Sequence, residues 1–476
     1  MTNGQHNENR RKALKEKAAK DYYRLTYHVM PEGGWMNDPN GLIQFRGQYH
    51  VFFQHYPYAT SWGPMHWGHV VSDDLLHWNY LPIALSPDQP YEKGCYSGSA
   101  VENHGELTLV YTAHDDSRSP KEVQCIATSR DGVTFEKYSG NPVIACPPEG
   151  MEEDFRDPKV FCAGGKWHMV VGCSGRSLGS IAMYVSEDLR HWEYKGIICQ
   201  SNGEQGTMWE CPDLFHLDGA DILMCSPINM KGTRTMFLTG KMDYKGYHFT
   251  PKCCDKVDYG PEFYAPQTFL DSRGRRILIG WMATWGEKIP TGKNGWAGAL
   301  TLPRELFLED GRVCQRPGRE ISSLRRETLH QGSIQLKDDQ HGNLSSVASD
   351  CMEIKISARE NSARRKTCGR LDFILRASAD FGECTVVSYD FERQELTVDT
   401  RNSGQGRKGR TVVKVPLKEG SLKIQMFVDR SSLEIFCGGG RYVISTRIFP
   451  QENSLYCDLV SKGSDITVES LEIYRL

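Results

Sequence analysis

Short stretches rich in apolar residues recur through the first 310 residues of the chain, each bounded by glycine, asparagine, aspartate or another turn-forming residue. Their length is that of a strand rather than of a helix. Five of them hold comparable places in successive units, at residues 49–55, 107–113, 167–173, 221–227 and 276–282. The pattern predicts an all-β N-terminal domain built from a strand-rich unit that is repeated five times.

A longer motif recurs in the same units and closes each time on an aromatic residue. Residues 72–78, 129–135 and 186–192 share the pattern Ser-x-Asp followed four residues later by that aromatic, and 243–249 repeats it more weakly. The closing residues lie at a constant interval of 57 residues, at Trp78, Phe135, Trp192 and Phe249. A repeat of this length is typical of β-propellers, in which four-stranded blades surround an axis. We therefore predict a five-bladed β-propeller over residues 22–310.

The pattern changes after residue 310. Residues 311–339 are polar and charged, which indicates a linker, and an alternating β-pattern follows from residue 340 to 476. Residues 422–429 and 432–436 read as strands, the three glycines at 438–440 mark a hairpin, and 465–476 reads as a closing strand. We expect a C-terminal β-sandwich at 340–476 in a supporting role. Residues 1–21 are expected to form a polar N-terminal tail, with a short helix as the alternative.

Composition narrows the class of protein. The chain has 476 residues, of which 39% are hydrophobic and 25% charged, and its net charge is −3. Such a charge argues against nucleic-acid binding, which needs a basic face, and no apolar run of membrane-spanning length appears. The basic segment 10–20 is followed by no apolar core of signal-peptide type, so we expect a cytoplasmic protein. The sequence does not decide the oligomeric state, and a homo-oligomer is one of the alternatives.

Cysteine and histidine give no sign of a metal site. The 16 cysteines are scattered without a Cys-x-x-Cys pair, and several fall inside apolar strands, where a free thiol behaves as a small hydrophobic group. His66 and His69 are close in sequence but lack a third ligand. We expect no metal and no cofactor.

Three acidic residues stand at nearly equivalent points of their units. Asp38, Asp157 and Glu210 precede the closing aromatics of their units by roughly 35 to 40 residues. Equivalent positions on the innermost strands of a propeller converge on the axis, so these carboxyl groups should meet in one pocket. The alternative, that they only form turns, does not account for the shared register.

The segment 35–41, Trp-Met-Asn-Asp-Pro-Asn-Gly, contains one of these acids and carries a resemblance to a known family. From residue 27 onward the chain resembles the invertase, or β-fructofuranosidase, family of glycoside hydrolases. The supporting motifs occur in the order of the family, at 62–69, 96–100, 155–159, 209–213, 263–267 and 428–434. The departures are minor, such as Tyr96 where members of the family often have Phe.

The resemblance implies a retaining double displacement with Asp38 as nucleophile and Glu210 as acid/base. Retention requires two carboxyl groups about 5 to 5.5 Å apart. Asn37 and Asn40 offer amide donors that would keep Asp38 ionised. The apolar neighbours of Glu210 along the chain would raise its pKa and keep its proton available.

The resemblance assigns Asp157 to transition-state stabilisation. Its neighbour Arg156 is expected to lower its pKa and hold it as a carboxylate. Negative charge placed in advance favours an oxocarbenium-like transition state. Without the shared register and the resemblance, Arg156 and Asp157 could equally be a structural ion pair.

Sugar binding needs polar groups for hydroxyls and flat apolar surfaces for C–H faces. The matched positions expected to bind substrate are Trp35, Met36, Asn37, Gln54, Trp62, Tyr96, Ser97, Arg156, Tyr264 and Trp281. Four other tryptophans we assign to the core, at Trp67, Trp78, Trp192 and Trp285.

The expected activity is release of fructose from terminal β-D-fructofuranosides, with sucrose or sucrose-6-phosphate as the small-molecule substrate. Alternatives are an exo-acting hydrolase of levan or inulin, a fructosyltransferase, and, in a different class, a propeller that only binds carbohydrate. A related five-bladed family of inverting hydrolases lacks the motifs at 35–41 and 428–434. A phosphorylated leaving group would need a cationic rim, for which the candidates are Lys159, Arg234 and Lys288.

Overall fold

The computed structural model describes residues 3–344, 346–361 and 368–476. The described chain begins with helix α1 (Asn3–Ala18), which is the alternative to the polar tail expected there, and then enters a ring of sheets. The first sheet contains β1 (Gly34–Phe45), β2 (Gln48–Tyr56), β3 (His66–Ser72) and β4 (Asn79–Leu85). No described helix is long and apolar enough to cross a membrane.

The same antiparallel arrangement of consecutive strands returns in four further sheets. The second holds β5 (Gly94–Asn103), β6 (Glu106–His114), β7 (Glu122–Ser129) and β8 (Glu136–Lys137); the third holds β9 (Phe155–Ala163), β10 (Lys166–Gly175), β11 (Leu178–Ser186) and β12 (Glu193–Gln200). The fourth holds β13 (Met208–Leu217), β14 (Ala220–Ile228), β15 (Met236–Asp243) and β16 (His248–Lys256); the fifth holds β17 (Tyr264–Leu270), β18 (Arg276–Trp281), β20 (Arg304–Glu309) and β21 (Arg312–Pro317). The five apolar runs picked out in the sequence coincide with the second strand of each sheet.

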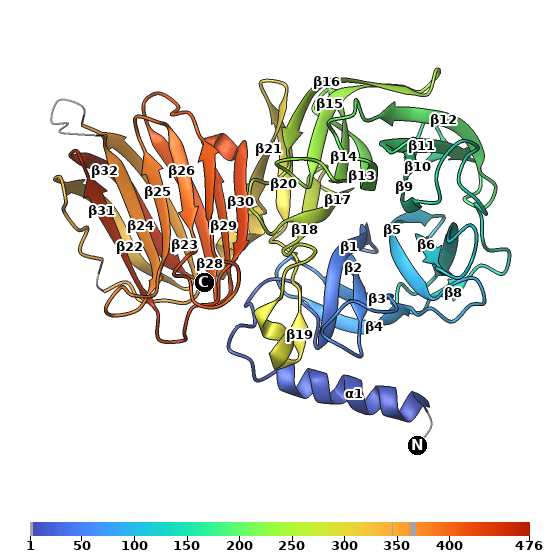
Figure 1. The fold of residues 1–476 in the computed structure, drawn as a ribbon, viewed down its shortest axis with the longest axis horizontal. Helices are drawn as coiled ribbons and strands as arrows, with labels where there is room; N and C mark the ends of the chain where they lie inside the picture. The colour runs from blue at the N-terminus through green and yellow to red at the C-terminus, as the bar shows by residue number, and fades with distance from the viewer. Residues whose placement is uncertain (1–2, 345, 362–367) are drawn as a thin grey trace.

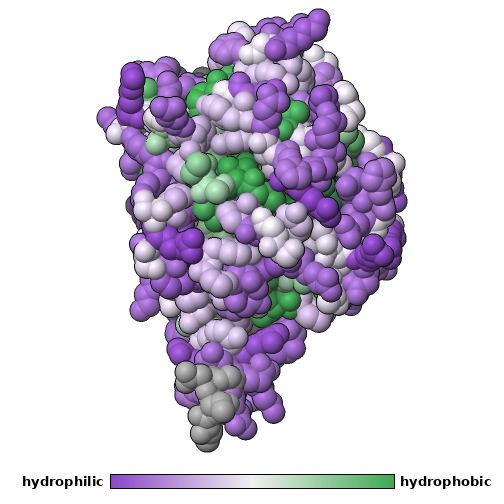
Figure 2. All heavy atoms as spheres, turned by 90° about the vertical axis from the view of Figure 1, so that its right-hand side faces the viewer, coloured by the Kyte–Doolittle hydropathy of each residue, from purple (hydrophilic) through white to green (hydrophobic). Residues whose placement is uncertain are grey.

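The first strands of these sheets form a closed ring at the centre of the domain. β1 contacts β5, β5 contacts β9, β9 contacts β13, β13 contacts β17, and β17 contacts β1 again. Short β19 (Trp296–Ala297), which follows 3-10 helix η1 (Pro290–Asn294), pairs in parallel with β1 and so ties the end of the ring to its beginning. Burial falls from the inner to the outer strands, since β1 is almost wholly buried and β16 is largely exposed. The face of the molecule drawn in Figure 2 is mostly hydrophilic, with hydrophobic residues gathered in small areas.

The Ser-x-Asp repeat forms the turn between the third and fourth strands. Oδ1 of Asp74 accepts hydrogen bonds from the backbone N–H of residues 76 and 77, both at 2.9 Å, and Ser72 donates to the same atom. Asp131 and Asp188 make the same pattern in the next two sheets. These acids therefore close turns, unlike the three acids on the innermost strands.

The C-terminal domain consists of two sheets that face each other across an apolar cluster. One sheet contains β22 (Glu327–Leu336), β32 (Ile466–Arg475), β23 (Met352–Glu360), β28 (Leu422–Asp429), β29 (Ser432–Cys437) and β30 (Tyr442–Arg447). The other contains β27 (Arg410–Lys414), β26 (Glu395–Asp399), β25 (Thr385–Asp390), β24 (Arg370–Ala377) and β31 (Tyr456–Lys462). The expected hairpin at the three glycines joins β29 to β30 through η4 (Gly438–Gly440).

The segment 311–339 differs from the expected linker. It contains β21, the outer strand of the fifth sheet, then 3-10 helix η2 (Arg319–Leu324), and then β22, an edge strand of the C-terminal domain. Most of β22 is exposed or half-buried. An edge strand with little buried surface needs few apolar residues, which explains why its sequence resembles a linker.

A buried charge network joins the two domains. His28 lies with Nδ1 3.0 Å from Asp429 Oδ2 and Nε2 2.9 Å from Glu434 Oε1. Arg304 donates from Nη2 to Glu434 at 2.7 Å and from Nη1 to Asp258 at 2.9 Å. Asp429 and Glu434 belong to the motif at 428–434, which therefore holds the C-terminal domain against the ring of sheets.

We expect Glu434→Gln to destabilise the protein by about 3 to 5 kcal/mol, because it removes from a buried network the carboxylate that both Arg304 and His28 contact, and leaves Asp258 as the carboxylate that still pairs with Arg304. The matched control is Glu327→Gln, whose carboxylate pairs with Arg475 at the surface and should contribute less than about 1 kcal/mol. Urea unfolding followed by tryptophan fluorescence measures both. Equal midpoints for the two variants would contradict the role given to the network.

Candidate active site

The described residues form several pockets, and one of them brings Asp38, Asp157 and Glu210 together. The pocket over the ring of inner strands has a volume of about 270 Å³ and is lined by Asn37, Asp38, Gln54, Trp62, Tyr96, Ser97, His114, Lys121, Glu122, Asp154, Arg156, Asp157, Glu210, Tyr264 and Trp285. Each of the five inner strands contributes to it, β1, β5, β9, β13 and β17. The three acids singled out in the sequence thus line one pocket.

Local irregularities of the inner strands lie where the pocket residues occur. The pairing of β1 with β2 shifts register between Met36 and Pro39, and that of β13 with β14 shifts between Glu210 and Asp213. Similar shifts occur at the pocket residues of β5, β9 and β17. Such β-bulges redirect side chains and are frequent beside active sites. Asp157 itself has a φ of 65°, which a non-glycine residue adopts only at a cost in backbone energy.

Asp38 is buried and held by neutral donors. Ser97 Oγ donates to its Oδ2 at 2.6 Å, and Asn37 Nδ2 donates to its Oδ1 at 3.1 Å. Burial raises the pKa of Asp38 to about 6, although both hydrogen bonds act in the opposite direction. Asn40 was expected to be a second direct donor; with its amide turned so that both polar atoms find partners, it instead accepts from Gln54 Nε2 at 2.9 Å and donates to Ser97 Oγ at 3.3 Å.

Glu210 is held by a cation and a phenol, where apolar surroundings were expected. Arg156 lies with Nε 2.9 Å and Nη2 2.8 Å from Glu210 Oε1, and the hydroxyl of Tyr264 donates to Oε2. The expectation was wrong because successive side chains of a strand point to opposite faces. Trp209 packs into the core between the third and fourth sheets rather than against the carboxyl group of its neighbour.

Asp157 lies deep in the pocket and has a raised pKa, where a lowered one was expected. Burial is the main cause, and the neighbouring charges of Glu210 and Asp38 add to it. Arg156 lowers the pKa of Asp157 too little to reverse this, because its guanidinium is bound to Glu210, Glu122 and Asp154. The backbone N–H of residue 211 donates to Asp157 Oδ2 at 2.9 Å.

The thiol of Cys211 lies between two of the acids, with Sγ 3.4 Å from Asp157 Oδ2 and 3.6 Å from Asp38 Oδ2. Burial and the surrounding carboxylates raise its pKa well above the usual value, so the thiol keeps its proton and acts as a donor. The two aspartates therefore share a donor that neither the repeat nor the charge pattern of the sequence indicated.

Three of the residues expected to bind substrate lie behind the lining of the pocket. Trp35 is buried and donates from Nε1 to Asn37 Oδ1 at 2.8 Å, so it orients the amide that contacts Asp38. Trp281 is fully buried and packs edge-on against Trp35 at 5.9 Å between ring centroids. Met36 is also fully buried. The other seven expected residues line the pocket.

Several lining residues were missed by sequence reasoning. Trp285, which we assigned to the core, is 37% exposed and lines the pocket, with its ring 5.1 Å from that of Trp281. His114 stacks on Tyr96 at 4.1 Å between ring centroids. Neither residue has an equivalent in the repeat, because both belong to loops or strand ends at the mouth. For Trp285, the available sequence signal was its place four residues after Trp281, a tryptophan already expected to bind substrate.

None of the three cations considered for a phosphate lines this pocket. Lys159 is buried, and its Nζ lies 3.1 Å from Asp213 Oδ2. Arg234 and Lys288 are exposed in loops. In residues 3–344, 346–361 and 368–476, no three His, Cys, Asp or Glu side chains are grouped closely enough to hold a metal ion.

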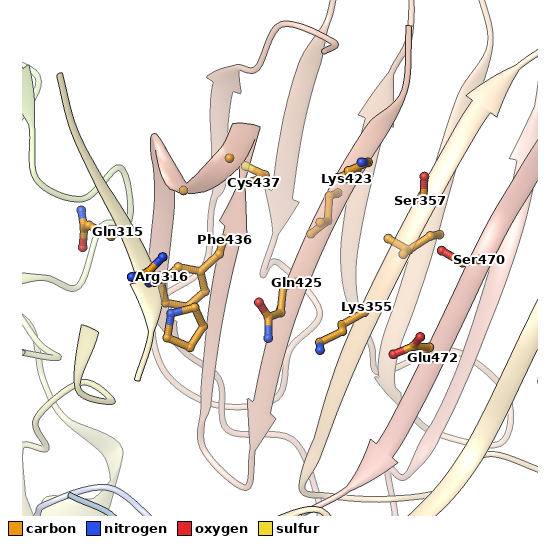
Figure 3. Close-up of a pocket in the computed structure, with 15 residues that line it drawn as sticks. Gln315, Arg316, Lys355, Ser357, Lys423, Gln425, Phe436, Cys437, Ser470 and Glu472 are labelled. Carbon is orange, nitrogen blue, oxygen red and sulfur yellow. The ribbon is translucent and has the colours of Figure 1, made fainter. Parts of the chain in front are cut away.

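Another pocket, of about 390 Å³, lies between β21 and the outer face of the C-terminal sheet (Figure 3). Its labelled side chains include Arg316, Lys355, Lys423 and a single acid, Glu472. Acid/base catalysis on a glycoside requires a pair of carboxyl groups. The pocket over the inner strands is therefore the candidate active site.

An all-β ring with clustered carboxyl groups over its inner strands has the scaffold and chemistry of a glycoside hydrolase. The profile of the glycosyl hydrolases family 32 N-terminal domain matches residues 28–317, and that of the family 32 C-terminal domain matches 320–475. The chain belongs to glycosyl hydrolase family 32.

Individual relatives match this chain over almost its full length. The raffinose invertase of Escherichia coli is 39% identical over 94% of both chains, and a sucrose-6-phosphate hydrolase of Zymomonas mobilis is 37% identical over 98% of this chain and 93% of its own. Among solved structures, the Bombyx mori GH32 β-fructofuranosidase superposes with a TM-score of 0.84 at 35% identity, covering 100% of this chain and 99% of its own. The similarity of this chain to solved structures of the family supports a β-propeller followed by a β-sandwich.

Proposed function

We propose that the chain is a retaining β-fructofuranosidase that releases fructose from sucrose or sucrose-6-phosphate. The observation that carries this proposal is the meeting of Asp38, Asp157 and Glu210, from three different inner strands, in one pocket. Membership of family 32 and relatives named for these activities support it. We infer further that the five sheets are the blades of a five-bladed propeller, which their closed ring of contacts supports.

Asp38 is the nucleophile in this proposal. It is buried beside neutral donors from Ser97 and Asn37, which stabilise the carboxylate that attacks the anomeric carbon. Attack forms a covalent fructosyl-enzyme ester and releases the glycosyl oxygen. Water then hydrolyses the ester and regenerates Asp38.

Glu210 is the acid/base, and Asp157 the stabiliser. Glu210 has a side chain that is 17% exposed, so it can reach both the leaving oxygen and the incoming water. Arg156 and Tyr264 fix both of its oxygens in position. Asp157 lies deeper, where it can accept hydrogen bonds from fructosyl hydroxyls that strengthen as positive charge develops on the ring.

We also propose a cytoplasmic location. All 16 cysteines are free thiols and most of them are buried, which fits a reducing compartment.

The pH profile tests the role of Asp38. Because the nucleophile must be ionised and its pKa is about 6, kcat/KM should fall as the pH drops through about 6. Ser97→Ala removes a hydrogen bond that lowers this pKa, so the acidic limb should move to higher pH by about 1 unit. The matched control is Ser99→Ala on the same strand, whose hydroxyl donates to the carbonyl oxygen of Pro158 and to no carboxylate. Identical limbs in the two variants would contradict the assignment.

A further inference from the structure

The mouth of the pocket is formed by two ion pairs rather than by free cations. Lys121 Nζ lies 3.0 Å from Asp154 Oδ1, and Arg156 Nη1 lies 2.9 Å from the same oxygen. Arg156 also contacts Glu122 at 3.2 Å and Glu210 at 2.8 Å. We call Lys121, Glu122, Asp154 and Arg156 the rim cluster. Lys121 and Asp154 are its outermost members, with side chains 28% and 39% exposed.

The rim cluster balances two carboxylates against two cations, and three further acids line the rest of the pocket, so no positive charge is left over for a phosphate. Among the described residues that line the pocket, five carry carboxyl groups and two carry permanent positive charge: Asp38, Glu122, Asp154, Asp157 and Glu210 against Lys121 and Arg156. Both cations already have carboxylate partners within hydrogen-bonding distance. His114 faces acids as well, with Nδ1 3.3 Å from Glu122 and Nε2 3.1 Å from Asp116.

Such a mouth treats a hydroxyl and a phosphate differently. A sugar hydroxyl can donate to Asp154 and accept from Lys121, so a neutral leaving group finds partners without displacing either ion pair. A phosphate carries close to two negative charges and offers only acceptors once it is ionised, so it meets carboxylates with the same charge. Like charges brought together at a binding site are a common means of rejecting one ligand in favour of another.

We propose that the rim cluster selects an uncharged glycosyl leaving group, so that the chain hydrolyses sucrose in preference to sucrose-6-phosphate. This inference rests on the proposed function, because it concerns the leaving group of the same reaction. It separates this chain from those relatives that are named for the phosphorylated sugar. Lys121 and Asp154 are the specificity-determining pair, since they form the part of the cluster that is most open to solvent.

The test compares kcat/KM for sucrose and for sucrose-6-phosphate on one enzyme preparation. At low ionic strength we expect the value for sucrose to be at least about tenfold higher. Added salt screens the repulsion, so it should raise the value for the phosphorylated sugar and leave that for sucrose nearly constant. This comparison needs no variant and therefore does not depend on the folding of one.

Variants of the rim cluster show which residues cause the preference for sucrose. Asp154→Asn removes one negative charge and deprives Lys121 and Arg156 of a carboxylate partner, so the ratio of the two kcat/KM values should shift toward sucrose-6-phosphate by at least about threefold. Lys121→Gln should shift it in the opposite direction. The matched control is Glu187→Gln, which makes the same charge change at a surface pair with Lys166 outside the pocket and should leave the ratio as it is.

The outcomes separate this inference from the proposed function. Faster hydrolysis of sucrose-6-phosphate than of sucrose, or equal shifts in Asp154→Asn and Glu187→Gln, would overturn the selection by charge and leave the double displacement standing. Release of fructose from neither sugar by the wild-type protein would overturn the proposed function and the inference together.

Discussion

Asp38→Asn is expected to lower kcat for sucrose by more than about 10³-fold while the protein stays folded. The amide has nearly the shape of the carboxylate but cannot form the fructosyl ester. It can still accept a hydrogen bond from Ser97 or Asn37, which now contact the carboxylate at 2.6 and 3.1 Å. The measurement is steady-state release of glucose and fructose, with the urea midpoint as a check of folding.

A matched substitution at the surface controls for the change of charge. Asp73→Asn alters an acid that accepts a hydrogen bond from the exposed side chain of Gln48, remote from the pocket, and should retain wild-type kcat. Wild-type kcat in Asp38→Asn would mean that another group attacks the anomeric carbon.

Glu210→Gln is expected to lower kcat for sucrose by about 10² to 10⁴-fold, the range for loss of general acid catalysis. Its effect should depend on the leaving group. β-D-Fructofuranosyl fluoride needs no proton on departure, so the variant should release a rapid burst of about one equivalent of fluoride per enzyme. Slow turnover should follow, because activation of water also needs Glu210.

The same fructosyl fluoride distinguishes the role of Asp38 from that of Glu210. Asp38→Asn should give no burst with the fluoride, because the ester cannot form. Rapid-quench measurement of fluoride checks both variants. A burst in Asp38→Asn, or equal losses on sucrose and on the fluoride in Glu210→Gln, would contradict the assigned roles.

Much of the ring of sheets could be predicted from the sequence because its units repeat. The apolar runs mark the second strands, where both faces are buried, and the Ser-x-Asp motif marks the turn between the third and fourth strands through the hydrogen bonds of Asp74 and its equivalents. The edge strand β22 was not predicted, since an exposed strand carries no apolar signature. Helix α1 was one of two alternatives for the N-terminal segment, because a sequence this polar shows no amphipathic period that would decide between a helix and a tail.

The three acids of the candidate site were predicted from the sequence, whereas their environments were predicted only in part. The register of the repeat identified Asp38, Asp157 and Glu210, because equivalent positions of inner strands converge on one axis. The partners of these acids come from other strands, so the contact of Arg156 with Glu210 and the thiol between the aspartates had no signal along the chain. For the same reason the ion pairs of the rim cluster could only be found in three dimensions.

The stereochemistry of the first product tests the double displacement most directly. Proton-decoupled ¹³C NMR during rapid hydrolysis of sucrose follows the anomeric carbon of fructose before mutarotation mixes the forms. With Asp38 as nucleophile, two successive inversions should deliver β-fructofuranose, the configuration present in the substrate. The α-anomer as first product would mean that water attacks directly and that Asp38 acts as a base, which would contradict the mechanism proposed for this pocket.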